Sequence, residues 1–101
     1  MKNLLIATAL SALSFSAMTS AAGDAAAGKT KVAVCAGCHG VDGISMIPMY
    51  PNLAGQKAAY TAKQLRDFKS KKRNDPVMAG MVAMLSDADI DNVAAYYESL
   101  K

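Results

Sequence analysis

Apolar residues recur along much of this chain at the spacing of α-helices, and glycine and proline separate the helical stretches. The clearest pattern covers residues 56–71, where charged residues fall mainly outside one apolar stripe. That stripe consists of Ala58, Ala59, Ala62, Leu65 and Phe68. The Asn-Asp-Pro sequence at residues 74–76 ends the pattern, because proline cannot continue a helix. We therefore expect an amphipathic helix over residues 56–71.

A second helix is expected at the end of the chain, beginning after Ser86. Serine is a favourable N-cap, and Asp87 and Asp89 would lie in the first turn, where acidic side chains interact well with the helix dipole. The pattern predicts a buried face made of Ile90, Val93, Ala94, Tyr97 and Leu100. Between the two helices, residues 77–85 form a short apolar segment that is rich in methionine.

The first part of the domain is expected to hold one more helix and a long loop. Asp24 can cap an alanine-rich helix that runs towards Val34 and ends just before Cys35, with Gly28 and Val32 on one face. Glycines and prolines punctuate residues 40–55, which predicts a loop. The sequence has no strand-like alternation, so we expect an all-α fold. A long loop in so small a domain normally needs something to wrap around.

The first residues have the order of a secretory signal peptide. Lys2 provides a basic start, residues 4–18 carry no charge, and small residues follow at 19–22. A membrane span is the alternative, but residues 4–18 fall short of the roughly 20 apolar residues that a span needs. We expect cleavage after Ala21, with cleavage after Ala22 nearly as favourable. The exported domain would then comprise residues 22–101 and contain no membrane span.

A mature chain of about 80 residues can bury only a small hydrophobic core, so such a domain usually needs disulfides, a metal or a cofactor for stability. The chain has two cysteines, one histidine and no tryptophan, so a large apolar cofactor would supply the buried apolar surface that the chain itself lacks. The formal net charge is +3, and removal of Lys2 lowers it to +2. This charge is too small to indicate a nucleic-acid partner.

Residues 35–39 read Cys-Ala-Gly-Cys-His, the pattern by which haem is attached covalently. Cys35 and Cys38, three positions apart on one helical turn, can each add to a different vinyl group of one porphyrin. His39 can then bind the iron. Export fits this chemistry, since haem attachment of this kind happens outside the cytoplasm. We therefore predict one covalently bound haem c, with iron as the metal.

Three other interpretations of the cysteine pair are weaker. A thioredoxin-like redox pair follows a strand in an α/β pattern, which this sequence lacks. A zinc site usually needs four ligands, whereas this chain offers three strong ones, all adjacent. A disulfide between Cys35 and Cys38 would close a very small loop and gain little stability from it.

The second axial ligand is harder to choose. As an iron ligand, His39 should donate its other N–H to a carbonyl, and a carbonyl of residues 48–51 is well placed in sequence. Without a second histidine, methionine is the natural sixth ligand. Five methionines are available, and spacing alone leaves the choice open: Met46, Met49, Met78, Met81 and Met84. Met46 and Met49 follow His39 closely, and Met81 and Met84 suit core packing. Met78 comes just after the helix break at Pro76, where a loop could present its side chain as a ligand.

The chain resembles the class I c-type cytochromes, specifically the small bacterial exported kind and one half of the periplasmic dihaem members. The matching stretches span the mature chain: residues 23–28, 32–40, 51–56, Tyr60 with Gln64 and Leu65, residues 78–81, and residues 85–97. The resemblance implies a small cytochrome c fold, with three main helices and a short one wrapped around a single haem. It also implies that Met78 is the axial ligand, with Met81 as the second choice, and that the carbonyl of Pro51 receives the His39 N–H.

The resemblance further implies that the first helix packs on the last, through Gly28 and Val32 against Tyr96 or Tyr97. The sequence contains one attachment motif, so we expect it to correspond to a single half of the dihaem proteins.

We expect the protein to be a soluble periplasmic electron carrier and not an enzyme, because iron held by both His39 and Met78 has no open site for a substrate. Its partners would be redox proteins that dock weakly and transiently. One alternative is an electron-transfer subunit of a larger dehydrogenase or oxidase complex. A second is a ligand-binding or peroxidatic haem protein, which would require a labile or missing Met78.

A basic run lies at the end of the long helix and includes Lys69, Lys71, Lys72 and Arg73. Such a run usually faces solvent, and cations at the end of a helix favour its dipole. The alternative is that it steers an acidic redox partner towards the protein.

Overall fold

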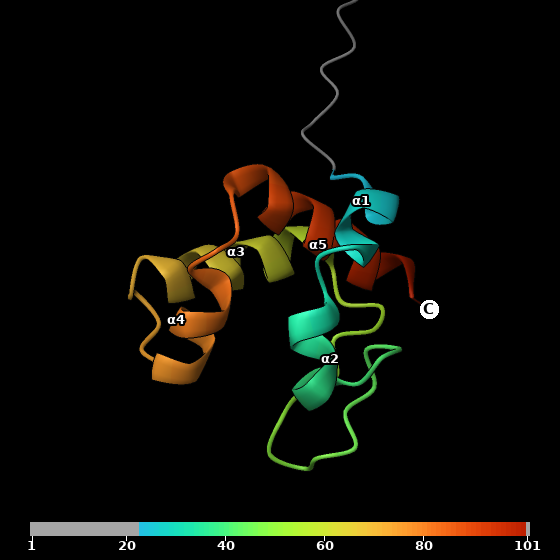
Figure 1. Ribbon diagram of the computed structural model, residues 1–101, viewed down its shortest axis with the longest axis horizontal. Coiled ribbons are helices and arrows are strands. Elements are labelled where there is room, and N and C mark those ends of the chain that lie inside the picture. Colours follow the sequence, from blue (N-terminus) through green and yellow to red (C-terminus); the bar gives the residue numbers. More distant parts are fainter. Residues whose placement is uncertain (1–22, 101) are drawn as a thin grey trace, which may run out of the picture.

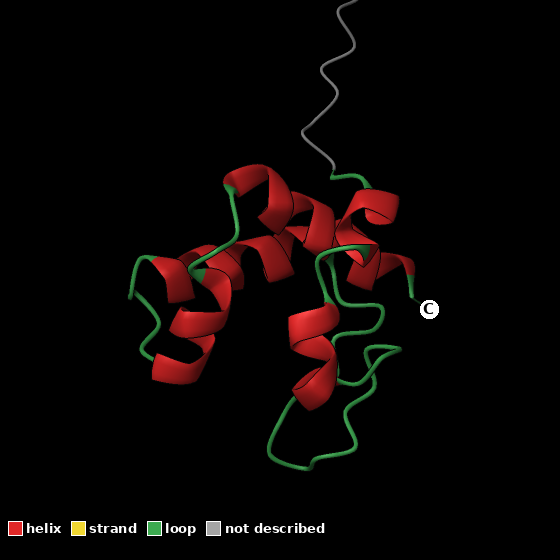
Figure 2. Cartoon of the chain, in the orientation of Figure 1, coloured by secondary structure: helices red, strands yellow, loops and turns green. Residues whose placement is uncertain are grey.

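The computed structural model describes residues 23–100. This part of the chain forms five helices: α1 (Ala25–Lys29), α2 (Ala33–His39), α3 (Ala58–Lys69), α4 (Pro76–Val82) and α5 (Asp87–Ser99) (Figure 1). No strand occurs among these residues (Figure 2), so the all-α prediction is confirmed. The predicted signal peptide lies outside the described residues. Within them, no helix has the length and apolar character to cross a membrane.

The core lies where α5 meets α1 and α3, and α4 packs against α3. Its buried apolar residues are Val32, Ala62, Leu65, Phe68, Val82, Leu85, Ile90, Val93, Ala94 and Tyr97. The predicted face of α5 is confirmed, with Leu100 half-buried at its end. On α3 the stripe differs at one position: Ala59 is exposed, and Thr61 is buried instead. Thr61 lies three residues after Ala58 and four before Leu65, so it falls on the same helical face as both.

The first helix does not run continuously to the cysteines as predicted. The expected cap is present, because the Asp24 carboxylate accepts hydrogen bonds from the N–H groups of Ala26 and Ala27. However, α1 ends at Lys29, and Thr30 turns its hydroxyl back to donate to the Ala27 carbonyl. A new helix, α2, then begins at Ala33 and contains both cysteines. Gly28 and the β-branched Thr30 and Val32 all disfavour a continuous helix here.

Gly28 lets the backbones of α1 and α5 touch. A Cβ atom at this position would lie 2.0 Å from the carbonyl oxygen of Asn92. The Asn92 side chain also accepts a hydrogen bond of 2.8 Å from the Asp24 N–H. The expected packing of the first helix on the last is confirmed, and the atoms of α5 nearest to Gly28 belong to Asn92 and Val93, about one turn before Tyr96 and Tyr97. Because glycine has no side chain, the two helix backbones can approach this closely.

A capping box begins α5, as the sequence around Ser86 suggested. The Ser86 hydroxyl accepts from the Asp89 N–H at 3.0 Å, and the Asp89 carboxylate accepts from the Ser86 N–H at 3.0 Å. The hydrogen bond from the Ser86 backbone lowers the pKa of Asp89. Two N–H groups at the helix end are thus satisfied, which stabilises the element that carries most of the core.

Ser86→Ala should therefore lower the free energy of unfolding by about 1 kcal/mol, the usual cost of losing a serine cap. Urea unfolding of the haem-loaded protein measures this change. Ser70→Ala is the matched control, because the Ser70 hydroxyl makes only a 3.4 Å contact with the Asp67 carbonyl. Equal losses in the two variants would contradict a capping role for Ser86.

Candidate functional site

The attachment motif lies on α2, at the C-terminal end of that helix. Cys35 and Cys38 lie three positions apart, which places both thiols on the same side of the helix. Both are free thiols and half-buried. His39 is the last residue of α2 and is buried, with 7% of its surface exposed. Gly40 then reverses the chain with φ = +86°, where a Cβ would lie 1.9 Å from the Ile44 carbonyl oxygen.

The ring of His39 is held by the backbone of Pro51. The Nδ1 atom lies 2.8 Å from the Pro51 carbonyl oxygen. A carbonyl only accepts hydrogen bonds, so Nδ1 carries the proton and donates it. The lone pair is then on Nε2, the tautomer in which a histidine can bind a metal through that nitrogen.

The loop of residues 40–55 places this carbonyl through its own hydrogen bonds. The Ser45 hydroxyl donates to the Cys38 carbonyl at 2.8 Å, and the Asn52 side chain accepts from the Ser45 N–H at 2.7 Å. The Gly43 carbonyl accepts from the N–H groups of Leu53 and Ala54. Sequence reasoning identified the loop but missed the roles of Ser45 and Asn52. The only sequence signal for them was that Asn52 follows Pro51 in the stretch that resembles the cytochromes.

Met78 lies in the first turn of α4 and not on a loop as its position after Pro76 suggested. Asp75 caps this helix, because its carboxylate accepts from the N–H groups of Val77 and Met78 at 3.0 and 3.1 Å. Proline is well tolerated at the first helical position, so Pro76 begins α4 instead of preventing it.

Burial separates Met78 from the other four candidate methionines. Met78 is half-buried and packs against the core. The others are exposed: Met81 by 42%, Met49 by 86%, Met84 by 91% and Met46 by 94%. An axial ligand must approach the interior of the fold, and this difference favours Met78.

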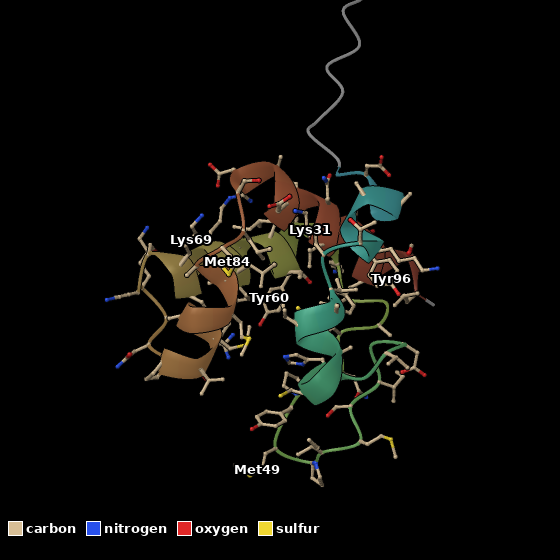
Figure 3. The ribbon with its side chains drawn as sticks, in the orientation of Figure 1. Lys31, Met49, Tyr60, Lys69, Met84 and Tyr96 are labelled. Atoms are coloured by element: carbon tan, nitrogen blue, oxygen red, sulfur yellow. The ribbon has the colours of Figure 1, made fainter. Side chains whose placement is uncertain are left out.

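The two helices that carry the candidate ligands lie on the same side of the α3–α5 pair. Figure 1 shows α2 and α4 below the α3–α5 pair, with α4 on the left and α2 to its right. Tyr60 of α3, labelled in Figure 3, lies between them in this view and is half exposed. Tyr50 is also close, with its ring centre 6.4 Å from that of His39.

Tyr97 connects α5 to the attachment motif. It is 2% exposed, and its hydroxyl has no well-aligned hydrogen-bond partner among the described residues. The hydroxyl lies beside the Cys35 thiol. Burial, followed by this thiol, raises the pKa of Tyr97 above its ordinary value. Burial likewise raises the pKa of Cys35, an effect that the tyrosine hydroxyl partly offsets.

The donor set fits a covalently attached haem. It comprises two thiols on one helical turn, an imidazole with Nε2 as its ligating nitrogen, and a partly buried thioether, which suit iron in a porphyrin. In the described part of the chain, no three or more His, Cys, Asp or Glu side chains are grouped to hold a metal ion, so a zinc site lacks its ligands there. A disulfide and a thioredoxin-like redox pair lack support as well, since both cysteines are free thiols and no strand precedes them in the described residues.

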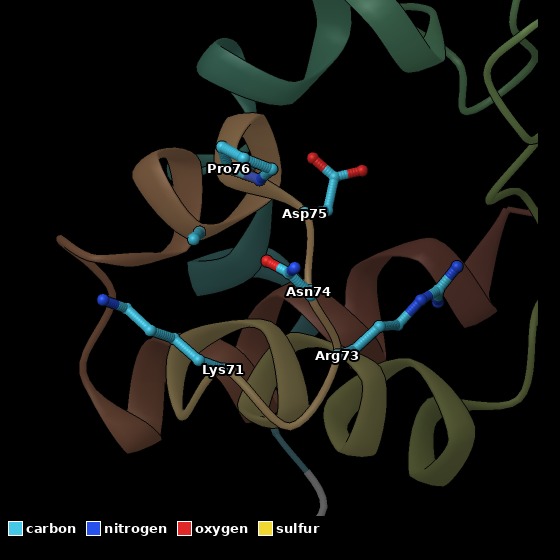
Figure 4. Close-up of a pocket in the computed structure, with 6 residues that line it drawn as sticks. Lys71, Arg73, Asn74, Asp75 and Pro76 are labelled. Atoms are coloured by element: carbon cyan, nitrogen blue, oxygen red, sulfur yellow. The ribbon is translucent and has the colours of Figure 1, made fainter.

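A shallow pocket of about 310 Å³ lies elsewhere, between the end of α3 and the start of α4 (Figure 4). Its lining includes the cap residue Asp75 but none of the candidate haem residues: Lys71, Arg73, Asn74, Asp75, Pro76 and Ala79. The pocket is formed by the turn that positions α4 and is separate from the haem-binding residues.

Residues 25–101 match the family model for cytochrome c. The chain belongs to the cytochrome c family. Its cofactor is accordingly a covalently bound c-type haem with iron, as the motif on α2 predicted. The resemblance stated from the sequence is confirmed.

Cytochrome c4 of Pseudomonas aeruginosa is 46% identical over 98% of this chain and 49% of its own length. Cytochrome c-554(548) of Halomonas halodenitrificans is 49% identical over 77% of this chain and 98% of its own length. The crystal structure of reduced recombinant cytochrome c4 from Pseudomonas stutzeri superimposes with a TM-score of 0.75, at 48% identity, over 79% of this chain and 47% of that one. The chain thus spans about half the length of the cytochrome c4 relatives that it matches.

Proposed function

We propose that this protein carries single electrons between redox proteins of the periplasm. In this proposal Cys35 and Cys38 would hold the haem covalently, and His39 and Met78 would bind its iron. The main supporting observation is the 2.8 Å contact between His39 Nδ1 and the Pro51 carbonyl, which leaves Nε2 as the ligating nitrogen. Met78 is supported by its burial, which is greater than that of the other methionines.

The surroundings of both ligands favour electron transfer over catalysis. When bound, the haem supplies a one-electron ferric–ferrous couple. The Pro51 carbonyl orients the His39 ring, and the Asp75 carboxylate accepts a hydrogen bond from the Met78 N–H, so the fold holds both residues in position. Iron bound by both residues would have no open position for a substrate. We therefore propose a carrier without catalytic activity.

The optical spectrum of the purified protein tests this function. Iron bound by His39 and Met78 should give a low-spin ferric spectrum with a weak band from sulfur ligation, and the protein should be reduced and reoxidised by one electron. The intact mass should equal the mature chain plus one haem. A high-spin ferric spectrum, or ready binding of carbon monoxide, would instead favour a ligand-binding or peroxidatic protein.

Export is a separate part of the proposal and has its own test. The haem-loaded protein from the periplasmic fraction should begin at Ala22, because Thr19 and Ala21 offer the small side chains that signal cleavage requires. N-terminal sequencing and intact mass measure this directly. An intact Met1 on the haem-loaded protein would contradict cleavage, and an N-terminus at Gly23 would move the cleavage site to Ala22.

Only part of the basic run at the end of α3 is free to take part in docking. Lys69 donates its ammonium to the Leu85 carbonyl. The Arg73 guanidinium lies 4.5 Å from the centre of the Phe68 ring and donates to the Gln64 side chain. These two cations therefore stabilise the fold around α3. Lys71 and Lys72 are exposed, and we propose that they are the part of the run that attracts acidic redox partners.

A further inference from the structure

Three hydrogen bonds connect the end of α2 to the loop that follows it and form a closed cycle. His39 donates from Nδ1 to the Pro51 carbonyl at 2.8 Å. The next residue along the chain, Asn52, accepts a hydrogen bond of 2.7 Å from the Ser45 N–H through its side-chain oxygen. The Ser45 hydroxyl donates to the carbonyl of Cys38 at 2.8 Å, and Cys38 directly precedes His39. We call these three bonds the 38–52 cycle.

Pro51 depends on this cycle because it cannot anchor its own backbone. Proline has no N–H group, so it contributes only a carbonyl to backbone hydrogen bonds. On one side of Pro51, the Asn52 side chain accepts from the Ser45 N–H. On the other side, the Tyr50 N–H donates to the Ile47 carbonyl, and the Ile47 N–H donates to the Ser45 hydroxyl. Ser45 therefore supports Pro51 from both directions.

Ser45 also joins this loop to the helix that carries the attachment motif. The last carbonyls of a helix have no partner within it, and the Ser45 hydroxyl supplies one for Cys38. The same hydroxyl lies 2.9 Å from the Ile47 carbonyl and accepts from the Ile47 N–H at 3.1 Å. Alanine at this position would lose all of these contacts, and the loop would be free to shift relative to α2.

The position of the Pro51 carbonyl affects His39 as a ligand. A histidine that donates its Nδ1 proton to an acceptor becomes a stronger electron donor at Nε2. A stronger donor stabilises ferric iron more than ferrous iron, so it lowers the reduction potential. Because a hydrogen bond weakens steeply as its distance and angle depart from the ideal, a carbonyl that shifts away from His39 raises the potential.

We infer that Ser45 and Asn52 are positioning residues that hold the Pro51 carbonyl against His39 and thereby lower the reduction potential. Both act through Pro51, and neither is a ligand of the iron. The inference rests on the proposed function, because it requires His39 to bind the iron. It adds to that function a specific way in which the loop sets the potential.

Redox titration of haem-loaded variants tests this role. Ser45→Ala and Asn52→Ala should each shift the one-electron equilibrium about threefold towards the ferrous form, a rise of about 30 mV at about 59 mV per tenfold change. Both bonds belong to one cycle, so the double variant should shift the equilibrium about as much as either single variant, whereas independent effects would add. Asn52 is exposed and Ser45 is half-buried, so neither substitution disturbs the core.

Two control variants separate the cycle from general effects of substitution. Gln56→Ala removes another amide side chain that accepts from a backbone N–H, that of Lys57 at 2.9 Å, but lies outside the cycle. Ser45→Thr retains the hydroxyl. Both should keep the wild-type potential. In the ferrous protein, NMR should show the His39 Nδ1 proton exchanging with solvent at least about tenfold faster in the two alanine variants and at the wild-type rate in both controls.

A retained low-spin spectrum with its sulfur band shows that a variant has kept its fold and both axial ligands. Alanine variants of this kind that keep the wild-type potential and proton exchange overturn the inference, and so does a double variant whose shift is the sum of the single shifts. A loop that only stabilises the fold would lower the free energy of unfolding on substitution and change neither readout. If the wild-type protein lacks the low-spin spectrum, the proposed function fails as well, so the two failures are distinguishable.

Discussion

Met78→Ala should abolish the weak sulfur band of the ferric spectrum and lower the reduction potential by more than about 60 mV, the equivalent of a tenfold change in a one-electron equilibrium. The reason is that methionine as an axial ligand favours the ferrous state, which raises the potential of a haem that also has a histidine ligand. Spectroscopy of the oxidised protein and a redox titration measure the two effects. Both should appear without loss of the covalently attached haem, since Cys35 and Cys38 remain.

Two further variants separate ligation from packing. Met78 packs against the core, so alanine at this position also removes buried apolar contact. Met78→Leu retains most of the volume and should still lose the sulfur band. Met81→Ala changes a side chain three residues later on α4 that is 42% exposed, and should preserve both band and potential. If Met81→Ala removes the band and Met78→Leu does not, the ligand lies one turn further along α4.

Gly28→Ala should destabilise the haem-loaded protein by about 3 kcal/mol, because the new methyl group has no space between α1 and α5. Its Cβ would lie 2.0 Å from Asn92 O and 2.9 Å from Val93 N. Both are backbone atoms, so relief requires the two helices to separate, and the hydrogen bond from Asp24 to Asn92 would be strained as well. Thermal unfolding should show a decrease in Tm of more than about 10 °C for a domain of this size.

Gly80→Ala is the matched control for this substitution. Gly80 lies inside α4, and no heavy atom is within 4 Å of the position that its Cβ would take. Alanine is the better helix former, so this variant should be more stable than the wild type by about 0.5–1 kcal/mol. If Gly28→Ala and Gly80→Ala unfold at the same urea concentration, the close approach of α1 and α5 does not limit stability.

The first and last helices show which features of the fold local sequence patterns can predict and which they cannot. The buried face of α5 and its cap at Ser86 were predictable, because amphipathic spacing and capping involve residues within a few positions of one another. The division of the first helix at Thr30 was missed. The alanines of residues 25–27 favour a helix, whereas Gly28, Thr30 and Val32 are weaker helix formers, and this local balance does not show where the helix ends. The contact of Gly28 with the backbone at Asn92 fixes where α1 lies on α5.

The choice among the methionines could not be made from spacing. Met78 and Met81 lie three residues apart in the same apolar segment, and either could have faced the interior. The Asp75 cap and Pro76 set the start of α4, and packing on α3 then determines which side of α4 is buried. Resemblance to the cytochromes suggested Met78, and its burial supports the same choice.

By itself, the sequence determined the all-α class, the membership of the cytochrome c family and the haem, because the attachment motif acts within five consecutive residues and helices follow local periodicity. Only the tertiary structure decided which residues from distant parts of the chain meet. It placed the Pro51 carbonyl at His39, Tyr97 beside Cys35, and the backbone of α1 on that of α5. No local pattern predicts these contacts, because each depends on how distant segments of the chain pack against one another.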